Sequence, residues 1–331
     1  MTLQVAVLGA GRWGSRLARA LANTPRARVA LVVDPSAEAR RRAEASGYLT
    51  ASEPRAAFED PHIGAVVIAT PSPTHATLAR AALEANRHVL VEKPLGLSVA
   101  EVAPLRALAM QRRRVLLVGH LLRYHPGVER LVELARSGEL GAMRYLHATR
   151  LNLGTVRSTE NAWWSLAPHD VSTVLAIVGR LPVRVGARGA AYLDPKIEDV
   201  VHAHLEFDGG VFAAIHVSWL DPQKRRQLTL VGSRRMATFD DLEPMEKLRL
   251  LDVASSSDDG GALRPRRGDI AVLRLEPVEP LAAELAHFVA CVLDGVAART
   301  GIDEGLDVVR VLEAGQRSLA AGGVLVSLDG A

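Results

Sequence analysis

Short runs of apolar, mostly β-branched residues alternate with helical patterns along the first part of the chain. These runs, each almost continuously hydrophobic, lie at residues 5–9, 29–34, 65–70, 88–94 and 115–120. Strands that are apolar on both faces and joined by helices are typical of a parallel sheet that helices cover on both sides. The pattern therefore predicts a doubly wound parallel α/β domain, which we place at residues 1–121.

From about residue 141 the pattern changes to an alternation of polar and apolar residues. Alternating segments lie at residues 144–153, 183–193, 199–207, 210–219 and 227–232. They predict a largely antiparallel open sheet with one exposed face, and Asp208-Gly209-Gly210 is a typical hairpin turn. We therefore expect an α+β domain at residues 122–331, in which closing helices within 281–321 could pack back on the first domain. One low-complexity stretch, residues 254–269, predicts a mobile loop.

Composition is that of a soluble globular protein, with 48% hydrophobic and 23% charged residues in 331. No apolar run reaches the roughly 20 residues that a membrane span needs, and the N-terminus enters a strand at once, so we expect neither a membrane segment nor a signal peptide. The single cysteine, Cys291, can form no internal disulfide and fits a reducing compartment. We therefore expect a cytoplasmic protein.

The pI of 9.3 raises the question of an anionic partner. Only four of the 40 basic residues are lysines, the arginines are spread along the chain, and aromatic residues make up 4%. A nucleic-acid-binding protein would group its basic residues on one face and place aromatic residues among them, so we expect no nucleic-acid partner. Solvated helix faces explain the charge best, and attraction of an anionic substrate such as a nucleotide sugar is the alternative.

The segment Gly9-Ala10-Gly11-Arg12-Trp13-Gly14 fits G-x-G-x-x-G between the first predicted strand and the first helix. In that position Gly9 permits a tight turn, Gly11 lets the backbone approach a pyrophosphate, and Gly14 lets the helix pack closely on the strand. The helix N-terminus supplies amide donors to phosphates. The motif in this context predicts a Rossmann domain that binds a dinucleotide.

Asp34 ends the second predicted strand, 20 residues after Gly14. An acidic residue at this spacing accepts hydrogen bonds from the ribose hydroxyls and repels a 2′-phosphate. The residues that follow, Pro35 and Ser36, include no arginine that could receive that phosphate. The sequence therefore favours NAD over NADP.

Lys93 follows the fourth predicted strand directly, between Glu92 and Pro94. It should therefore lie at the carboxyl edge of the sheet, where ligands bind in this architecture. Desolvation there would lower the pKa of the amine and suit it to proton transfer or to polarisation of a carbonyl. An ordinary solvated lysine is the alternative.

The glycine motif, Ala69-Thr70-Pro71 with Thr74-His75, and Glu92-Lys93-Pro94 together resemble the Gfo/Idh/MocA oxidoreductase family. The resemblance continues through residues 164–170 (WSLAPHD) to residues 303–319, and so covers essentially the whole chain. It implies a Rossmann domain followed by an α+β domain, and a cis Lys93–Pro94 peptide. Besides the three glycines and Asp34, the cofactor contacts that we expect are Arg12, Trp13, Thr70, Pro71, His75, Glu92 and Lys93.

The resemblance places Lys93 beside the nicotinamide and the reacting oxygen, and makes His169 the proton acceptor. From the residues alone, His169 follows Pro168 at the expected start of an apolar helix, where the helix N-terminus would keep the imidazole neutral. A capping or core histidine is the alternative. Ser165 stands where many relatives carry an aspartate; it can hydrogen-bond a hydroxyl but cannot supply negative charge.

Polar residues in segments leading to the expected cleft are candidate substrate contacts, with turn chemistry or interdomain pairing as the alternative for each. They are Arg123, Tyr124, Arg150, Asn152 and Asn161, together with Ser165, Lys93 and His169. We expect Trp163 and Trp164 to fill the core. We expect no metal site: His202, His204, Glu206 and His216 could bind zinc, but the polar face of an open sheet explains them better. In this family that face pairs subunits, which implies a homodimer or homotetramer.

Within the family, residues 119–126, 150–170 and 216–241 resemble enzymes that oxidise the 3-hydroxyl of UDP-N-acetylhexosamines before an aminotransferase acts. This implies NAD-dependent oxidation of a secondary hydroxyl, at C3, of a sugar, a nucleotide sugar or a sugar of an aminoglycoside-like metabolite. The alternatives are an NADPH-dependent deoxysugar ketoreductase, a cyclitol dehydrogenase, and a non-catalytic protein that senses sugar or NAD. Asp34 argues against the NADPH-dependent enzyme, and retention of both Lys93 and His169 argues against a sensor.

Overall fold

The computed structural model describes residues 1–257 and 263–328, with the side chains of all of these except 253–267. The chain divides into two compact units. The first joins Met1–Tyr124 to Val278–Val309, and the second joins His125–Pro277 to Arg310–Ala331. The division into domains at residue 121 stays a prediction.

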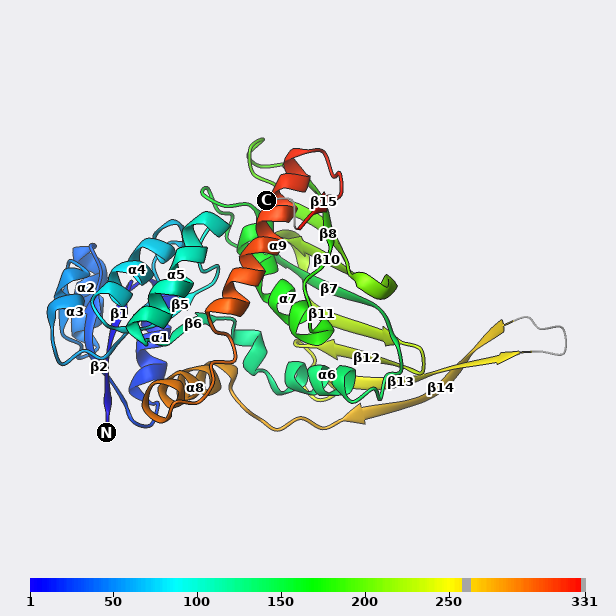
Figure 1. Ribbon diagram of the computed structural model, residues 1–331, viewed down its shortest axis with the longest axis horizontal. Helices are drawn as coiled ribbons and strands as arrows, with labels where there is room; N and C mark the ends of the chain where they lie inside the picture. The colour runs from blue at the N-terminus through cyan, green and yellow to red at the C-terminus, as the bar shows by residue number, and fades with distance from the viewer. Residues whose placement is uncertain (258–262, 329–331) are drawn as a thin grey trace. The chain divides into compact units, whose positions relative to one another are not determined.

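The first unit is built on a parallel sheet of six strands in the order β3-β2-β1-β4-β5-β6 (Figure 1). The strands are β1 (Leu3–Leu8), β2 (Ala27–Val33), β3 (Thr50–Ala51), β4 (Ala65–Ile68), β5 (His88–Glu92) and β6 (Leu116–Gly119). The connecting helices are α1 (Arg12–Ala22), α2 (Ala37–Ala45), α3 (Arg55–Glu59), α4 (His75–Glu84) and α5 (Val99–Arg112). This confirms the doubly wound parallel sheet, whose strand order reverses direction beside β1.

Apolar spacing explains how the helices attach to this sheet. Leu17, Ala18 and Leu21 of α1 recur at helical spacing and are buried. Helix α8 (Pro280–Asp294) packs against α1 in the same unit and buries Leu281, Leu285 and Phe288 in the core that it shares with β1 and α1. Helices α1 and α8 therefore share one apolar core with the sheet.

The second unit holds a sheet of nine strands in the order β14-β13-β12-β11-β7-β10-β9-β8-β15. The strands are β7 (Met143–Leu153), β8 (Arg184–Ala190), β9 (Val200–Glu206), β10 (Phe212–Ser218), β11 (Leu220–Gly232), β12 (Arg235–Asp240), β13 (Leu248–Ser257), β14 (Leu263–Leu273) and β15 (Val326–Ser327). Only the pairing of β10 with β7 is parallel among those described, so the prediction of a largely antiparallel sheet is confirmed.

Three helices belong to this part of the chain: α6 (Pro126–Arg136), α7 (Ala162–Val178) and α9 (Ile302–Ala320), which continues into it from the first unit. Helix α7 packs on β7, β9 and β10, and α6 packs on β12. The predicted hairpin between β9 and β10 is confirmed, with Gly209 and Gly210 at φ of 76° and 77° in its turn. Such φ values favour glycine.

The prediction of a mobile loop over residues 254–269 was wrong for most of its length. Strands β13 and β14 run side by side there (Figure 1), with pairs from Val253–Arg267 to Ser257–Leu263. Strand pairing satisfies backbone groups whatever the side chains, so a segment rich in serine and glycine can still form a ladder. Residues 258–262, within the same predicted loop, lie outside the described residues.

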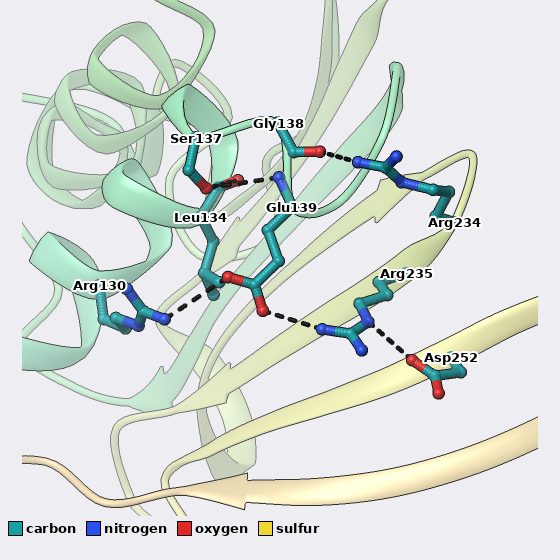
Figure 2. A network of polar contacts seen from close by, with 8 residues as sticks. All are labelled: Arg130, Leu134, Ser137, Gly138, Glu139, Arg234, Arg235 and Asp252. Carbon is teal, nitrogen blue, oxygen red and sulfur yellow. Dashed lines mark hydrogen bonds and ion pairs between the residues drawn. The ribbon is translucent and has the colours of Figure 1, made fainter.

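A network of polar contacts holds the turn after α6 to the sheet (Figure 2). Glu139 lies 3.6 Å from Nη2 of Arg130 and 2.9 Å from Nη1 of Arg235, and Arg235 Nε donates to Asp252 at 2.7 Å. The network thus joins the end of α6 to β12 and β13. In the described part of the chain, no helix is both long and apolar enough to cross a membrane.

Candidate functional site

The predicted cofactor residues come together at one edge of the first sheet. Because parallel strands end at the same edge, the residues that follow them are neighbours. The residues that follow β1, β2, β4, β5 and β6 are Gly9, Asp34, Ala69, Lys93 and His120. This edge holds the candidate site of the first unit.

The glycine motif forms a tight turn at the start of α1. Gly9 has a φ of 98°, and a Cβ there would lie 2.6 Å from the carbonyl oxygen of Ala69. A Cβ on Gly14 would lie 1.8 Å from the carbonyl oxygen of Gly9, so only glycine allows this approach. Beside Gly11 a Cβ would meet no described atom within 4 Å, so the backbone there is open to a ligand. The turn fits a pyrophosphate at the helix N-terminus.

Asp34 is held by the turn that it faces. One carboxylate oxygen accepts a hydrogen bond from the amide of Ala10 at 2.7 Å, and the other accepts one from Ser36 at 2.8 Å. An arginine further along the chain also reaches this turn. Arg40, one turn into α2, donates through Nη1 to the carbonyl oxygens of Asp34 at 2.8 Å and Pro35 at 2.9 Å. The guanidinium of Arg40 therefore holds the backbone of the turn that follows β2.

His75 joins two loops of this edge. Its ring is buried, with Nδ1 2.7 Å from the carbonyl oxygen of Pro94 and Nε2 2.8 Å from that of Thr70. The Lys93–Pro94 peptide is cis, as predicted. His75 therefore positions the Thr70-Pro71 turn against the Lys93 turn, and direct contact of these residues with a cofactor stays a prediction.

Glu92 lies behind Lys93 and is almost fully buried. Its carboxylate accepts a hydrogen bond from the indole N–H of Trp13. Burial raises the pKa of Glu92, while the Trp13 bond and the charge of Lys93 oppose that rise. On the neighbouring strand a Cβ at Gly119 would lie 3.2 Å from this carboxyl group, so the glycine makes room for it.

Two further buried titratable groups stand near Lys93 or Glu92, and sequence reasoning missed both. His120 is 1% exposed, with Nε2 3.9 Å from an oxygen of Glu304, and burial lowers its pKa. Glu284 of α8 is fully buried, and neither oxygen has a hydrogen-bond partner among the described residues. Burial, and then the charge of Glu92, raise the pKa of Glu284. The sequence could have indicated Glu284, because it is a lone glutamate in an apolar helical run.

Arg123 and Tyr124 are engaged within the first unit. Arg123 Nη1 donates to Glu304 at 3.1 Å. Tyr124 is 2% exposed, and its hydroxyl lies 3.1 Å from that of Thr300. The guanidinium of Arg299 lies 4.9 Å from the ring centroid. These contacts stabilise the turn after β6, and substrate contact by either residue stays a prediction.

In the second unit Asn161 is the N-cap of α7. Its side-chain oxygen accepts a hydrogen bond from the amide of Trp164 at 3.1 Å, and its amide group donates to Glu198 at 2.7 Å and Gln316 at 2.9 Å. Asn161 therefore caps a helix, which is the alternative to substrate contact that the sequence left open. Trp163 and Trp164 are buried, as expected.

His169 lies inside α7 and not at its start, so the argument from the helix N-terminus was wrong. The helix begins at Ala162 and accepts Pro168 within it, which removes one backbone donor without ending the helix. Ser165 and His169 are four residues apart and therefore share a helix face. Ser165 is buried and His169 half-buried, so the two side chains form one candidate site on α7.

Arg150 pairs with Asp170, the residue after His169. Its Nε and Nη2 donate to the two carboxylate oxygens at 2.6 and 2.8 Å, and both side chains are buried. Burial lowers the pKa of Arg150, but Asp170 outweighs it, so the net shift is upward.

Asn152 accepts a hydrogen bond from Arg226, a residue that sequence reasoning also missed. The pairing of β11 with β7 would have pointed to Arg226, because it sets this residue opposite Arg150.

The histidines of the open sheet face form a separate group. His202 and His216 stack across β9 and β10 with centroids 3.8 Å apart, beside a shallow cavity of about 430 Å³ that His147 and His204 also line. Among the residues whose side chains are described, no three His, Cys, Asp or Glu converge as a metal site.

Lys93 belongs to the first unit and His169 to the second. The family model "Oxidoreductase family, NAD-binding Rossmann fold" matches residues 3–120, and the "GFO/IDH/MocA C-terminal domain" matches residues 128–238.

UDP-N-acetylglucosamine 3-dehydrogenase of Acidithiobacillus ferrooxidans is 31% identical over 261 residues, which cover 76% of this chain and 80% of that enzyme. A solved structure of that enzyme, GnnA, has a TM-score of 0.84 at 26% identity and covers 97% of this chain and 99% of its own. GenD2 from gentamicin A biosynthesis was solved in complex with NAD. It has a TM-score of 0.84 at 28% identity, and the match covers 98% of this chain and 96% of GenD2. The resemblance drawn from the sequence is thus confirmed, and the chain belongs to the Gfo/Idh/MocA family of oxidoreductases, with NAD as the cofactor of its Rossmann domain.

Proposed function

We propose that the protein oxidises a secondary hydroxyl, at C3, of a sugar or nucleotide sugar. The observation that carries this proposal is the position of Lys93, at the sheet edge that also holds the glycine turn and Asp34, with the buried Glu92 behind it. The names of two similar proteins support the substrate class, since one is a UDP-N-acetylglucosamine 3-dehydrogenase and the other belongs to gentamicin A biosynthesis.

Bound NAD would supply the hydride acceptor. Lys93 would donate a hydrogen bond to the substrate oxygen as it changes from hydroxyl to carbonyl. The charge of Lys93 in turn lowers the pKa of the buried Glu92. The glycine turn would hold the pyrophosphate and Asp34 the adenosine ribose, which leaves the end of β5 for the reacting part of the cofactor.

His169 would take the hydroxyl proton as general base. Ser165, on the same face of α7, would hydrogen-bond the substrate and so orient it, but a hydroxyl cannot hold negative charge. The ion pair of Arg150 with Asp170 fixes the part of α7 that carries His169.

Oxidation of an unactivated secondary alcohol by NAD is unfavourable near neutral pH, so the product alone should accumulate poorly. We therefore propose that a reaction that consumes the ketone follows, namely transamination by an aminotransferase. The open sheet face, where the exposed rings of Tyr145 and Phe212 stack 5.5 Å apart, would pair subunits into a homodimer or homotetramer.

The experiment that tests the function follows NADH formation over a panel of UDP-sugars, aminoglycosides and cyclitols, with and without a sugar aminotransferase and its amino donor. We expect little NADH from the protein alone and much more with the aminotransferase. NMR of the coupled product would show the amine at C3. An amine at C4 or C6 would reject the regiochemistry, and turnover of cyclitols alone would make the protein a cyclitol dehydrogenase.

A further inference from the structure

Arg226 stands on the face of the sheet that α7 covers, opposite Arg150 in the register of β11 and β7. Its side chain is half-buried. Nη1 donates to the carbonyl oxygens of Leu151 and Arg225, each at 3.0 Å, and Nη2 donates to the side-chain oxygen of Asn152. The hydrogen bonds described for this guanidinium therefore go to uncharged oxygens.

The carboxylates near Arg226 are already engaged with other cations. Asp170 receives both bonds of the bidentate pair with Arg150. Asp241 lies 3.5 Å from Nε2 of His125 and 3.9 Å from Nζ of Lys247. Among the side chains that the structure describes, none forms an ion pair with Arg226.

Three cations, Arg150, Arg226 and Lys247, lie in this group. The carboxylates Asp170 and Asp241 lie among them, the charge of Glu129 acts on His125, and burial lowers the pKa of His125. Burial, and then the charge of Arg150, lower the pKa of Arg226 to about 10, which still leaves the guanidinium charged at neutral pH. A half-buried cation that forms no ion pair with a described side chain favours an anion beside it.

We propose that Arg226, together with Asn152, binds an oxyanion that the substrate carries outside the ring being oxidised. A guanidinium is suited to phosphate and carboxylate because its donors form a planar fork. Asn152 is already a candidate substrate contact, and Asp170 of the same group follows His169 on α7. This inference rests on the proposed function and narrows its substrate: nucleotide sugars and uronic acids are favoured, while polycationic aminoglycosides are repelled.

The kinetic test compares Arg226→Gln with Arg225→Gln. Arg225 is the matched control, because it is adjacent, exposed and bonded through Nη2 to Gln223 at 2.8 Å. For UDP-N-acetylglucosamine we expect Arg226→Gln to raise KM by about 10- to 100-fold, the range of one charge-assisted contact, with a smaller change in kcat. For neutral N-acetylglucosamine we expect little change, and Arg225→Gln should behave as wild type with both. Equal losses on the two sugars, or a wild-type preference for an aminoglycoside, would overturn the inference.

A binding measurement separates this inference from the proposed function. Calorimetry with UDP, glucuronate and inorganic phosphate, each at low and high salt, needs no turnover. We expect wild-type binding that weakens with salt and is lost in Arg226→Gln but kept in Arg225→Gln. Loss of UDP binding alone assigns the oxyanion to a phosphate, and loss of glucuronate binding alone assigns it to a carboxylate. Unaltered binding of every probe by a folded Arg226→Gln, or by Arg226→Lys where the former unfolds, refutes the subsite. If no sugar is oxidised but these results hold, only the proposed reaction fails.

Discussion

The indole N–H of Trp13 donates a hydrogen bond to the carboxylate of Glu92. Trp13 belongs to the glycine motif at the start of α1, and Glu92 is the last residue of β5, directly before Lys93. One contact therefore joins the turn that would bind the pyrophosphate to the residue that stands behind the candidate catalytic amine. Because Glu92 is buried, the bond also helps to keep its carboxylate ionised.

We expect Trp13→Phe to lower kcat about 10- to 100-fold, since a hydrogen bond to a charged group contributes about 1.5–3 kcal/mol. The loss should be greatest at acidic pH. Without the indole donor the pKa of Glu92 rises further, so the acid limb of the pH–rate profile moves to higher pH. A double-mutant cycle with Glu92→Gln isolates the bond. Additive effects, or an unmoved acid limb, would show that the contact has no part in catalysis.

Glu284 predicts a pH dependence of stability. Burial raises its pKa well above the usual value, so the folded state holds a proton that the unfolded state releases above its own pKa of about 4.3. The unfolded state then binds fewer protons, and the free energy of unfolding falls as pH rises from that value towards the folded pKa. Glu284→Gln, which resembles the neutral acid, should therefore raise Tm at pH 8 more than at pH 5.

The control for Glu284 is Glu84→Gln, at an exposed position on α4. It should leave Tm nearly unchanged at both pH values. If Glu284→Gln destabilises the protein equally at pH 5 and pH 8, Glu284 is not a protonated acid in the folded state. Differential scanning calorimetry over this pH range measures both variants.

Asp34→Ser should narrow the preference for NAD over NADP. The variant removes the charge that would repel a 2′-phosphate, while Arg40 remains beside the same turn and can approach that phosphate. We expect the ratio of the two Kd values to change at least about tenfold, which corresponds to about 1.4 kcal/mol. Arg40→Gln in the Asp34→Ser background should reverse part of the gain. Equal wild-type affinity for the two cofactors in a titration would refute the role of Asp34.

Lys93→Met should lower kcat by about 10²–10⁴-fold, the range for a residue that acts on the reacting proton or oxygen. NAD should still bind, because the glycine turn and Asp34 are unaltered. Stopped-flow kinetics for the hydride step and fluorescence titration for NAD separate the two effects. Near-normal turnover would show that Lys93 is a structural residue.

The sheet of the first unit was predictable because its strands are apolar on both faces and its motifs follow directly from strand ends. Gly9, Asp34 and Lys93 meet at one edge for that reason alone. Contacts made across the fold were not predictable. Arg40 reaches the Asp34 carbonyl from the next helix, and the burial of Glu284 depends on how α8 packs.

Local rules also misplaced two features of the second unit. Pro168 predicted a helix start, yet α7 begins at Ala162 because Asn161 caps it and the helix accepts a proline within it. The serine-rich segment after Val253 predicted a loop, yet within it β13 and β14 pair as far as Ser257 and Leu263. For α7 one local signal, the Asn161 cap, outweighed another, and for β13 and β14 the pairing of strands outweighed composition.

His169 offers the sharpest test of the proposed chemistry. It lies within α7, so the helix N-terminus does not hold its ring neutral, and its role as base depends on the substrate and on neighbours such as Ser165. His169→Ala should lower kcat by about 10²–10⁴-fold near neutral pH. The deficit should shrink as pH rises, because hydroxide can replace the lost base. Ser165→Ala, the matched control on the same helix face, should raise KM more than it lowers kcat and should keep the wild-type pH profile. If His169→Ala instead shows a deficit that is constant from pH 6 to pH 10, the histidine positions the substrate and another group takes the proton.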